Sequence, residues 1–396
     1  MNSPPSRLRE LLGRPTPATG LNRESTAEAF TFDPQDKLHQ VETTLRQIPS
    51  EDMGDPAEFE RALQVFMQHA ETGVHQVDRT GDATGHNSRI AMEAVIRVDG
   101  SRPSLLIKKG TVDPEYPLVQ TWKETLVKVL PGLQARIAAI GRIEPSTPGS
   151  NNFFGTGWVV KKDPDENSGL ILTNLHVLEE MRKRLSNAVL SNGKGGFQFL
   201  GDSAFIDFAA ESGSLDRKRF KIVEATPSGI DGPGYARLDA AVMKIAPVGS
   251  AGAALAVPDP IPVIPDIAGA QGELASFCVV GYPGPAPYSS GVHEGVDWVW
   301  VNSILFGGRF GVKRLAPGQS HKRLGDVAGD AHPWVFGHDA TTLGGSSGSP
   351  VLSWLDDTKG GFGLHFAGAN IDSNYAHALA QMQVELEKLG VPFGTT

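Results

Sequence analysis

From about residue 137 onward, the sequence consists of short apolar runs that glycine and proline interrupt, a pattern typical of all-β proteins. The chain contains 46 glycines and 28 prolines among its 396 residues, which supply the many turns that such a structure needs. This region of roughly 250 residues shows no internal repeat and is within the size range of one all-β domain. We predict strands at residues 140–143, 155–160, 170–175, 220–223, 240–245, 277–280, 298–305, 351–354 and 362–366.

The region before residue 137 predicts helices instead. Phe59, Leu63 and Phe66 recur at helical spacing, and Pro56 stands where the first turn of a helix tolerates proline. We predict helices at residues 36–48, 56–71, 89–97 and 118–129, a loop at 80–87, a strand at 105–108 and a closing helix at 376–389. Residues rich in Pro, Ser, Thr and Arg predict a disordered leader. The expected parts are a leader (1–30), an α-rich module of unknown role (31–136) and a β-rich domain (137–396).

The composition argues against several classes of function. The formal net charge is -9 and the sequence has no cluster of Lys and Arg, so we expect no nucleic-acid partner. No stretch reaches the ~20 apolar residues of a membrane span. Residues 1–20 hold no apolar run of the kind found in signal peptides. We therefore expect a cytoplasmic protein that does not enter membranes, with non-classical export left open.

The cysteine and histidine residues indicate neither a disulfide framework nor a metal site. Cys278 is the only cysteine of the sequence and stands within the apolar run 274–280, which predicts a buried structural thiol. His321, His332 and His338 lack the spacing of metal ligands. We expect no metal and no cofactor.

The run Gly-Gly-Ser-Ser-Gly-Ser-Pro, from Gly344 to Pro350, is the strongest candidate for a catalytic turn. Glycine permits the positive or strained backbone angles of such a turn, which can direct the N–H groups of Gly345 and Ser347 at one developing oxyanion. Turns rich in glycine and serine are also common in surface loops. A serine hydroxyl becomes a good nucleophile only beside a base that a third group orients, so the run needs partners elsewhere.

The best partners are one histidine and one aspartate. His176 ends the apolar run 170–175, and Asp239 opens the run Ala-Ala-Val-Met-Lys-Ile. Each has an ordinary structural alternative, a core histidine in one case and a strand-end cap in the other. A carboxylate at the start of a buried strand needs a hydrogen-bonding partner. The chain order His, Asp, Ser, each in a strand–loop context, favours one joint catalytic arrangement.

Residues 137–390 resemble a trypsin-like serine peptidase of the chymotrypsin fold. The motifs that carry the resemblance are Gly-Thr-Gly-Trp-Val-Val at 155–160, Thr-Asn-Leu-His-Val at 173–177, Leu-Asp-Ala-Ala-Val at 238–242, Val-Val-Gly-Tyr-Pro at 279–283, His-Asp-Ala-Thr-Thr-Leu at 338–343 and Gly-Leu-His-Phe-Ala-Gly at 363–368. The resemblance implies two six-stranded β-barrels with the active site between them. It implies Ser347 as nucleophile, His176 as general base and then acid, and Asp239 as its orienter. The N–H groups of Gly345 and Ser347 would form the oxyanion hole.

The details are most similar to bacterial peptidases related to glutamyl endopeptidases. This likeness implies a primary pocket built by Thr342, His365, Ala367 and Gly368, in which His365 and Thr342 would contact an acidic P1 side chain. The alternative is that His365 hydrogen-bonds to the surrounding backbone and that the pocket accepts another side chain.

One position departs from the animal trypsins. These place an aspartate immediately before the nucleophile, where it pairs with a newly freed N-terminus, whereas this chain has Ser346. Activation by insertion of a new N-terminus is therefore not expected. The N-terminal module becomes the candidate for control, through a regulatory partner.

Two alternatives remain beside a serine endopeptidase that acts on proteins or peptides. The same run also fits the Gly-x-Ser-x-Gly turn of α/β-hydrolases, with Ser346 as nucleophile and Asp356 and His365 as partners. That fold needs a helix where 351–354 predicts a strand, and no alternation of strands and helices precedes it. The other alternative is a binding or scaffold protein that has lost activity on a protease fold, against which the complete triad argues.

Overall fold

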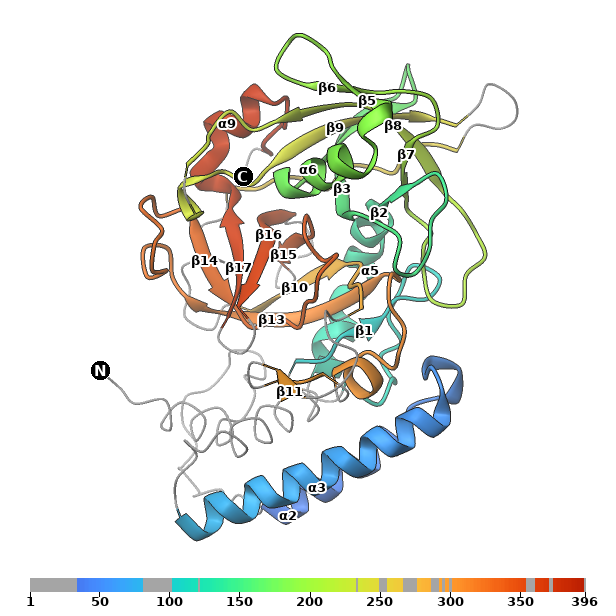
Figure 1. The fold of residues 1–396 in the computed structure, drawn as a ribbon, viewed down its shortest axis with the longest axis vertical. Helices are drawn as coiled ribbons and strands as arrows, with labels where there is room; N and C mark the ends of the chain where they lie inside the picture. The colour runs from blue at the N-terminus through green and yellow to red at the C-terminus, as the bar shows by residue number, and fades with distance from the viewer. Residues whose placement is uncertain are drawn as a thin grey trace. The chain divides into compact units, whose positions relative to one another are not determined.

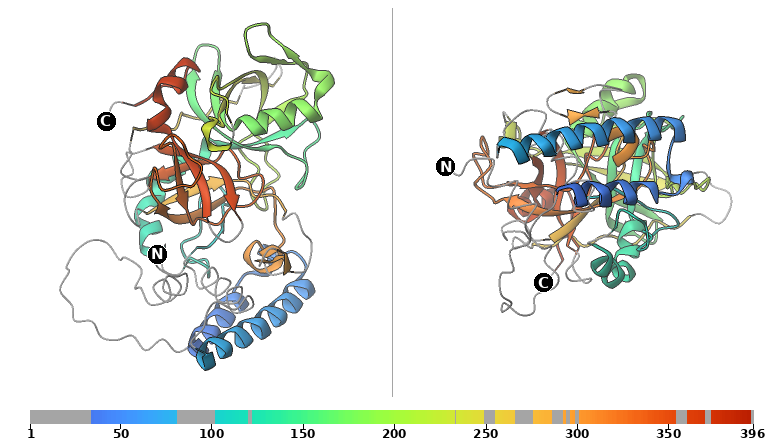
Figure 2. Two further views of the ribbon diagram at one scale, coloured as in Figure 1. Left: turned by 60° about the vertical axis from the view of Figure 1, so that its left-hand side comes forward. Right: turned by 90° about the horizontal axis from the view of Figure 1, so that it is seen from below.

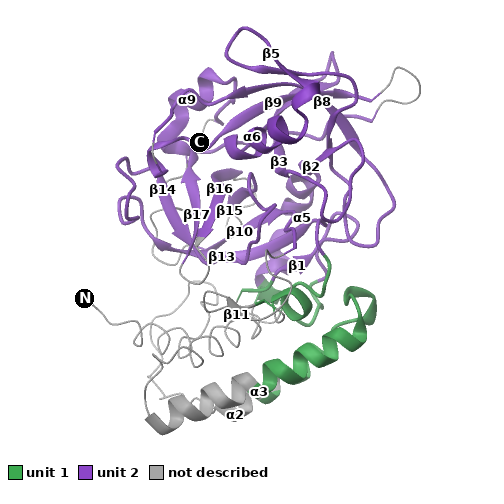
Figure 3. Cartoon of the chain, viewed as in Figure 1, with its two compact units in different colours: residues 1–103, 114–124, 286–309 green, residues 104–113, 125–285, 310–396 purple. Residues whose placement is uncertain are grey.

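The computed structural model describes residues 34–80, 102–119, 122–232, 234–248, 255–265, 276–285, 292–293, 296–298, 301–353, 360–369 and 373–394. The predicted leader (1–30), the predicted helix at 89–97 and most of the predicted loop at 80–87 lie outside these residues. The chain divides into two compact units (Figure 3). The helical unit contains residues 1–103, 114–124 and 286–309, and the barrel unit contains residues 104–113, 125–285 and 310–396. The predicted domain boundaries stay a prediction.

The first barrel of the barrel unit is a closed antiparallel sheet (Figure 1). The order of its strands is β8-β7-β2-β3-β4-β9, and pairing of β8 with β9 closes it. The bounds are β2 (Ile140–Pro145), β3 (Gly155–Asp163), β4 (Ser168–Thr173), β7 (Ala204–Asp207), β8 (Arg219–Pro227) and β9 (Ala241–Pro247). A hairpin of β5 (Val189–Ser191) and β6 (Phe197–Phe199) extends the sheet beyond β8. Alternate side chains of a strand point to the same face of the sheet. Side chains that are buried within the barrel unit in this way include Trp158, Ile171 and Phe220.

The second barrel is built in the same way. Its strand order is β13-β10-β15-β16-β17-β14, and pairing of β13 with β14 closes it. The bounds are β10 (Ser276–Gly281), β13 (Arg314–Lys322), β14 (Val335–His338), β15 (Pro350–Ser353), β16 (Gly361–Ala369) and β17 (Ser373–Ala378). β1 (Leu105–Leu106) adds one further strand along β13. The rings of Phe277, Phe336 and Phe362 pack against one another in its core. The prediction of two six-stranded barrels of the chymotrypsin type is confirmed.

The helical unit contains a helical hairpin, with α2 (Pro34–Arg46) and α3 (Pro56–Thr80) side by side (Figure 2). Leu45 of α2 and Leu63 of α3 are buried, as their helical spacing requires. The Asp55 carboxylate accepts a hydrogen bond from the Ala57 N–H at 2.8 Å and so caps the start of α3. α3 extends beyond the predicted 56–71.

A segment inserted between β10 and β13 belongs to the helical unit rather than to the barrel. The strand predicted at 298–305 is wrong, because residues Val301–Leu305 form a short π-helical turn, η6, that packs against α3. The sequence at 298–305 is apolar because this segment is buried against a helix. A short apolar stretch of this kind cannot be distinguished from a buried strand by its sequence pattern.

The helix predicted at 118–129 is displaced in the structure. α5 (Lys123–Ala138) begins later and continues through Pro131. Proline removes one backbone donor and costs about 3 kcal/mol inside a helix, which is why the prediction ended there. Leu126 and Leu133 are buried along one face of α5, and this packing offsets the defect.

The closing helix predicted at 376–389 is wrong in its first part. Residues 376–378 belong to β17, and η7 (Leu379–Met382) and α9 (Gln383–Lys388) follow. Pairing with two other strands determines this stretch, because Ala376 lies opposite Phe336 on β14 and Ala378 lies opposite Gly363 on β16. The C-terminal helix itself is confirmed.

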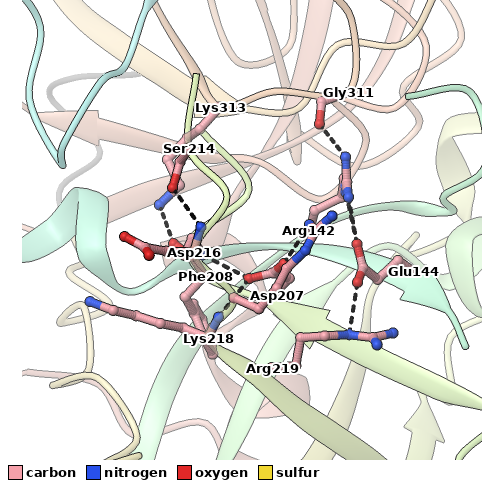
Figure 4. A network of polar contacts seen from close by, with 12 residues as sticks. Arg142, Glu144, Asp207, Phe208, Ser214, Asp216, Lys218, Arg219, Gly311 and Lys313 are labelled. Atoms are coloured by element: carbon pink, nitrogen blue, oxygen red, sulfur yellow. Dashed lines mark hydrogen bonds and ion pairs between the residues drawn. The ribbon is translucent and has the colours of Figure 1, made fainter. Parts of the chain in front are cut away.

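A buried network of charged side chains joins the two barrels (Figure 4). Glu144 on β2 accepts hydrogen bonds from Arg142 Nε at 2.9 Å and Nη2 at 2.7 Å, and it pairs with Arg219 Nε at 2.9 Å. Arg142 also donates to the carbonyl of Gly311, which precedes β13. Burial raises the pKa of Glu144, and the neighbouring Arg142 opposes this shift.

Lys313 is a lysine whose side chain is fully buried in the same part of the interior. Its Nζ donates to the carbonyls of Ile137 at 3.0 Å and Phe208 at 2.9 Å and lies 3.6 Å from Glu211 Oε1. Burial lowers the pKa of Lys313 to about 8, although Glu211 opposes the shift. The folded protein therefore releases this proton more readily than the unfolded chain does.

This difference predicts a rise of stability with pH. Below pH 8, Lys313 is charged in both states and its burial reduces stability. Between pH 8 and about 10.5 only the folded state loses the proton, so the free energy of unfolding rises, by about 2 kcal/mol from pH 7 to pH 10. Urea unfolding at pH 7, 8, 9 and 10 measures this rise. The same rise in Lys313→Met would contradict the assignment.

Candidate active site

The pairing of β4 with β9 brings His176 and Asp239 together. Thr173 at the end of β4 lies opposite Ala241 at the start of β9, so the residues just beyond both positions emerge side by side. His176 Nδ1 lies 2.6 Å from Asp239 Oδ2, and the His176 N–H donates to Asp239 Oδ1 at 2.9 Å. The predicted strand at 170–175 is two residues too long, because α6 (Leu175–Arg184) begins there. His176 thus stands in the first turn of a helix.

The electrostatics of this pair fix the form of the histidine. Burial acts to raise the pKa of Asp239, but hydrogen bonds and charge interaction with His176 outweigh it, so the pKa lies below its ordinary value. The carboxylate therefore stays ionised and accepts the proton on Nδ1. His176 Nε2 then carries a lone pair and can serve as a base. The His176 side chain is 41% exposed.

The turn around Ser347 can be formed only with glycine at two positions. Gly345 has φ +90° and Gly348 has φ +87°, both in the region that side chains disfavour. A Cβ on Gly345 would lie 2.6 Å from the Tyr282 carbonyl oxygen, and one on Gly348 would lie 2.1 Å from the Thr156 carbonyl oxygen. Both glycines are therefore required by close backbone approach as well as by φ.

Strands of the first barrel hold this turn. The Thr156 N–H donates to the Ser347 carbonyl at 2.9 Å, and Thr173 Oγ1 donates to the Thr156 carbonyl at 2.7 Å. Thr173 precedes His176 by three residues, so Thr156 and Thr173 link the serine turn to the segment that carries the histidine. Among the described residues the hydroxyl of Ser347, which is half-buried, has no hydrogen-bond partner. Catalytic hydrogen bonds often tighten only when substrate binds.

The backbone of the turn presents two free donors. The Gly344 carbonyl accepts from the Gly284 N–H at 2.6 Å, and the Gly345 carbonyl accepts from Thr156 Oγ1 at 2.9 Å. With both carbonyls held, the N–H groups of Gly345 and Ser347 donate to no acceptor in the part of the chain that the structure describes. Two such adjacent N–H groups can stabilise an oxyanion.

The α/β-hydrolase alternative is wrong. Ser346 is 3% exposed, and its N–H donates to the Leu343 carbonyl at 3.0 Å. The run is followed by strand β15, where that fold requires a helix. Ser346 therefore does not fit the role of nucleophile that this alternative assigns to it.

The residues of the predicted specificity pocket lie in two segments. Thr342 is half-buried in the segment before the serine turn, and Ala367 and Gly368 lie on β16 opposite Tyr375 and Asn374.

His365 is inside the protein. It is 3% exposed, and its Nδ1 lies 3.2 Å from His338 Nε2. Burial, with a smaller contribution from His176, lowers the pKa of His365 to about 3, while a hydrogen bond with the backbone of Tyr375 opposes the shift. The ring is therefore neutral at neutral pH.

Three residues that support the site were not predicted. Asn174 Nδ2 donates to the Asp239 carbonyl at 2.8 Å, Thr156 holds the turn, and His377 Nε2 lies 3.2 Å from the Asp239 nitrogen. Thr156 and Asn174 stand inside the sequence motifs at 155–160 and 173–177, so the sequence could have indicated their role. His377 stands in no motif, and only the barrel topology brings it to Asp239.

Within the described residues, no group of three or more His, Cys, Asp or Glu side chains is placed to hold a metal ion. None of the helices found in those same residues is both long and apolar enough to cross a membrane. The cytoplasmic location stays a prediction.

Comparison with known proteins agrees with this geometry. The family model described as a trypsin-like peptidase domain matches residues 155–357. A protein of Lysobacter enzymogenes described as a "probable serine protease" is 40% identical over 364 residues, which are 90% of this chain and 89% of that protein. Among solved structures, an inactive form of Rv3671c from M. tuberculosis H37Rv is 18% identical with a TM-score of 0.35, covering 72% of this chain and 98% of that chain. The active form of that protease is 17% identical with a TM-score of 0.34, covering 69% and 89%. By the family model and the identity to the Lysobacter protein, the chain belongs to the trypsin-like peptidase family of serine proteases.

Proposed function

We propose that the protein is a serine endopeptidase in which Ser347 is the nucleophile, His176 the general base and Asp239 its orienter. The observation that carries the proposal is the 2.6 Å contact of His176 Nδ1 with Asp239, together with a turn that presents two unpaired N–H groups. Its substrates would be proteins or peptides.

The proposed reaction has two halves. Ser347 Oγ attacks the carbonyl carbon of the scissile bond while His176 Nε2 takes its proton. The oxyanion receives hydrogen bonds from the Gly345 and Ser347 N–H groups, each worth about 3 kcal/mol of barrier lowering. The imidazolium, stabilised by Asp239, then gives the proton to the leaving amine and an acyl-enzyme remains. Water, activated by the same histidine, hydrolyses the ester.

Replacement of the nucleophile provides the direct test. Ser347→Ala is expected to lower kcat at least about 1,000-fold, because the covalent step is lost, and to abolish labelling by a fluorophosphonate. Ser346→Ala serves as the matched control and is expected to retain labelling at Ser347. Unchanged proteolysis in Ser347→Ala would contradict the assignment. A wild-type protein that is not labelled would favour the inactive scaffold.

The two glycines before Ser347 offer a test of the oxyanion turn. Gly345→Ala is expected to lower kcat about 100-fold with little change in KM, because its Cβ would displace one oxyanion donor. Gly344→Ala is the matched control, since a Cβ there meets nothing within 4 Å and φ is not in the left-handed region. Steady-state kinetics on one peptide compare the two. Equal losses would contradict a specific role for Gly345.

Preference for an acidic P1 side chain and the relation to glutamyl endopeptidases stay predictions. A neutral His365 would meet a carboxylate as an N–H donor rather than as a cation. Its ring contacts with His338 and the Tyr375 backbone mean that a substrate would have to replace one of them. The predicted alternative, in which His365 serves only the surrounding structure, therefore also has support.

Cleavage of a peptide library measures the P1 preference. The proposal expects an excess of cuts after Glu and Asp, and a Glu peptide cut faster than its Gln counterpart because only the carboxylate forms a charge-assisted hydrogen bond. An excess of cuts after Lys, Arg or Leu would contradict it.

Control through the helical unit is part of the proposal. Within this unit, Arg309 donates to the Met53 carbonyl at 3.3 Å, and a Cβ on Gly307 would lie 2.6 Å from the Asp52 carbonyl oxygen. The inserted segment 286–309 directly follows Gly284 and Pro285, and the Gly284 N–H holds the Gly344 carbonyl at 2.6 Å. A regulatory partner of the helical unit would thus act on the oxyanion turn through the chain itself. Comparing the full chain with one that begins at residue 104, which lacks the hairpin of α2 and α3 but keeps the inserted segment, tests whether the hairpin contributes to this control; equal kcat would contradict a contribution of the hairpin.

A further inference from the structure

Asp239 makes hydrogen bonds with both barrels. Three contacts come from the segment after β4, namely the two from His176 to the carboxylate and the one from Asn174 to the carbonyl. The fourth comes from β17 of the second barrel, where His377 Nε2 accepts the Asp239 N–H at 3.2 Å. Every polar group of Asp239 is therefore held, and His377 reaches it from the barrel that carries Ser347.

The tautomer of His377 follows from this contact. A backbone amide can only donate, so Nε2 must carry the lone pair and Nδ1 must carry the proton. Burial lowers the pKa of His377 to about 4, and the charge of Asp239 opposes the shift, so the ring is neutral at neutral pH. The acceptor is therefore present under the conditions in which a serine peptidase works.

Packing alone does not explain a histidine at this position. The ring is fully buried and stacks on Phe366, with centroids 4.1 Å apart and planes 12° apart. Its Nδ1 is buried and has no hydrogen-bond partner among the described residues. Leaving a buried donor unpaired is unfavourable, and a phenylalanine would give the same stacking without it. What phenylalanine could not supply is the acceptor for Asp239.

The position of His377 is fixed relative to the serine turn. Leu364 on β16 lies opposite His377, and its neighbour His365 accepts the Gly348 N–H through its carbonyl at 2.9 Å. One short path therefore runs from Asp239 through the His377 side chain, and then through strand pairing and one backbone hydrogen bond, to the residue after Ser347.

We propose that His377 is a positioning residue that sets the His176–Asp239 pair in register with Ser347 by binding the Asp239 backbone. The inference rests on the proposed function, since it assigns a role toward that same triad. His377 touches neither the substrate nor the reacting atoms. Its loss should lower the rate of acylation and leave substrate binding intact.

The test compares replacements that keep or remove the acceptor. His377→Phe keeps the stacking and is expected to lower kcat at least about tenfold with KM within about twofold. His377→Gln places an amide oxygen near the position of Nε2 and is expected to restore kcat to within about threefold of the wild type. If His377→Phe fails to fold by urea unfolding, His377→Leu replaces it as the variant without an acceptor.

A spectroscopic readout separates positioning from general destabilisation. The proton in the short His176–Asp239 contact gives a low-field ¹H NMR signal, which is expected to move or broaden in His377→Phe and to persist in His377→Gln. Wild-type kcat in His377→Phe, or equal losses in both variants with the signal unchanged, would overturn the inference. Failure of the proposed function would look different, because the wild type itself would then show no fluorophosphonate labelling at Ser347.

Discussion

Thr156 makes the contacts on which the site depends most. Its N–H binds the Ser347 carbonyl and its own carbonyl accepts from Thr173. Its hydroxyl donates to the Gly345 carbonyl and accepts the Tyr282 N–H at 3.1 Å. This buried residue of the first barrel thus holds both the strand that leads to the histidine and the turn of the second barrel that carries the serine. A hydroxyl is needed because it donates and accepts at once.

The buried polar groups around the site explain how two barrels form one enzyme. Apolar cores would hold each barrel together but would not set their register, since hydrophobic contact is not directional. Directional contacts cross between the barrels at several points, among them Arg142 with Gly311 and Lys313 with Phe208. Two of these crossings involve the proposed catalytic residues themselves, namely His377 with Asp239 and Thr156 with Ser347. Each places charged or polar atoms in the interior, where their partners must be well aligned.

The sequence was sufficient for the fold class because local motifs surround the residues at the barrel ends. The sequence was insufficient for elements that are determined only by the strand pairing that closes each barrel. β13 was missed because Arg-Leu-Ala-Pro-Gly-Gln-Ser-His-Lys shows no alternation, yet it pairs with both β10 and β14. His377 was missed for the same reason, since its partner is 138 positions away in the chain. The predicted roles of His176, Asp239 and Ser347 stay predictions. The structure brings His176 into contact with Asp239 and links the turn of Ser347 to the strand before the histidine through Thr156 and Thr173.

We infer that the turn held by Thr156 can receive an oxyanion without rearrangement. A crystal structure with a peptide aldehyde, which forms a tetrahedral adduct with the nucleophile, measures this most directly. We predict a bond between the aldehyde carbon and Ser347 Oγ, with the adduct oxygen about 2.7–3.1 Å from the Gly345 and Ser347 nitrogens. The Gly344 carbonyl is expected to keep its hydrogen bond with the Gly284 N–H. An adduct on another residue would contradict this inference. So would an adduct structure in which the peptide bond before Gly345 has flipped to bind the adduct oxygen.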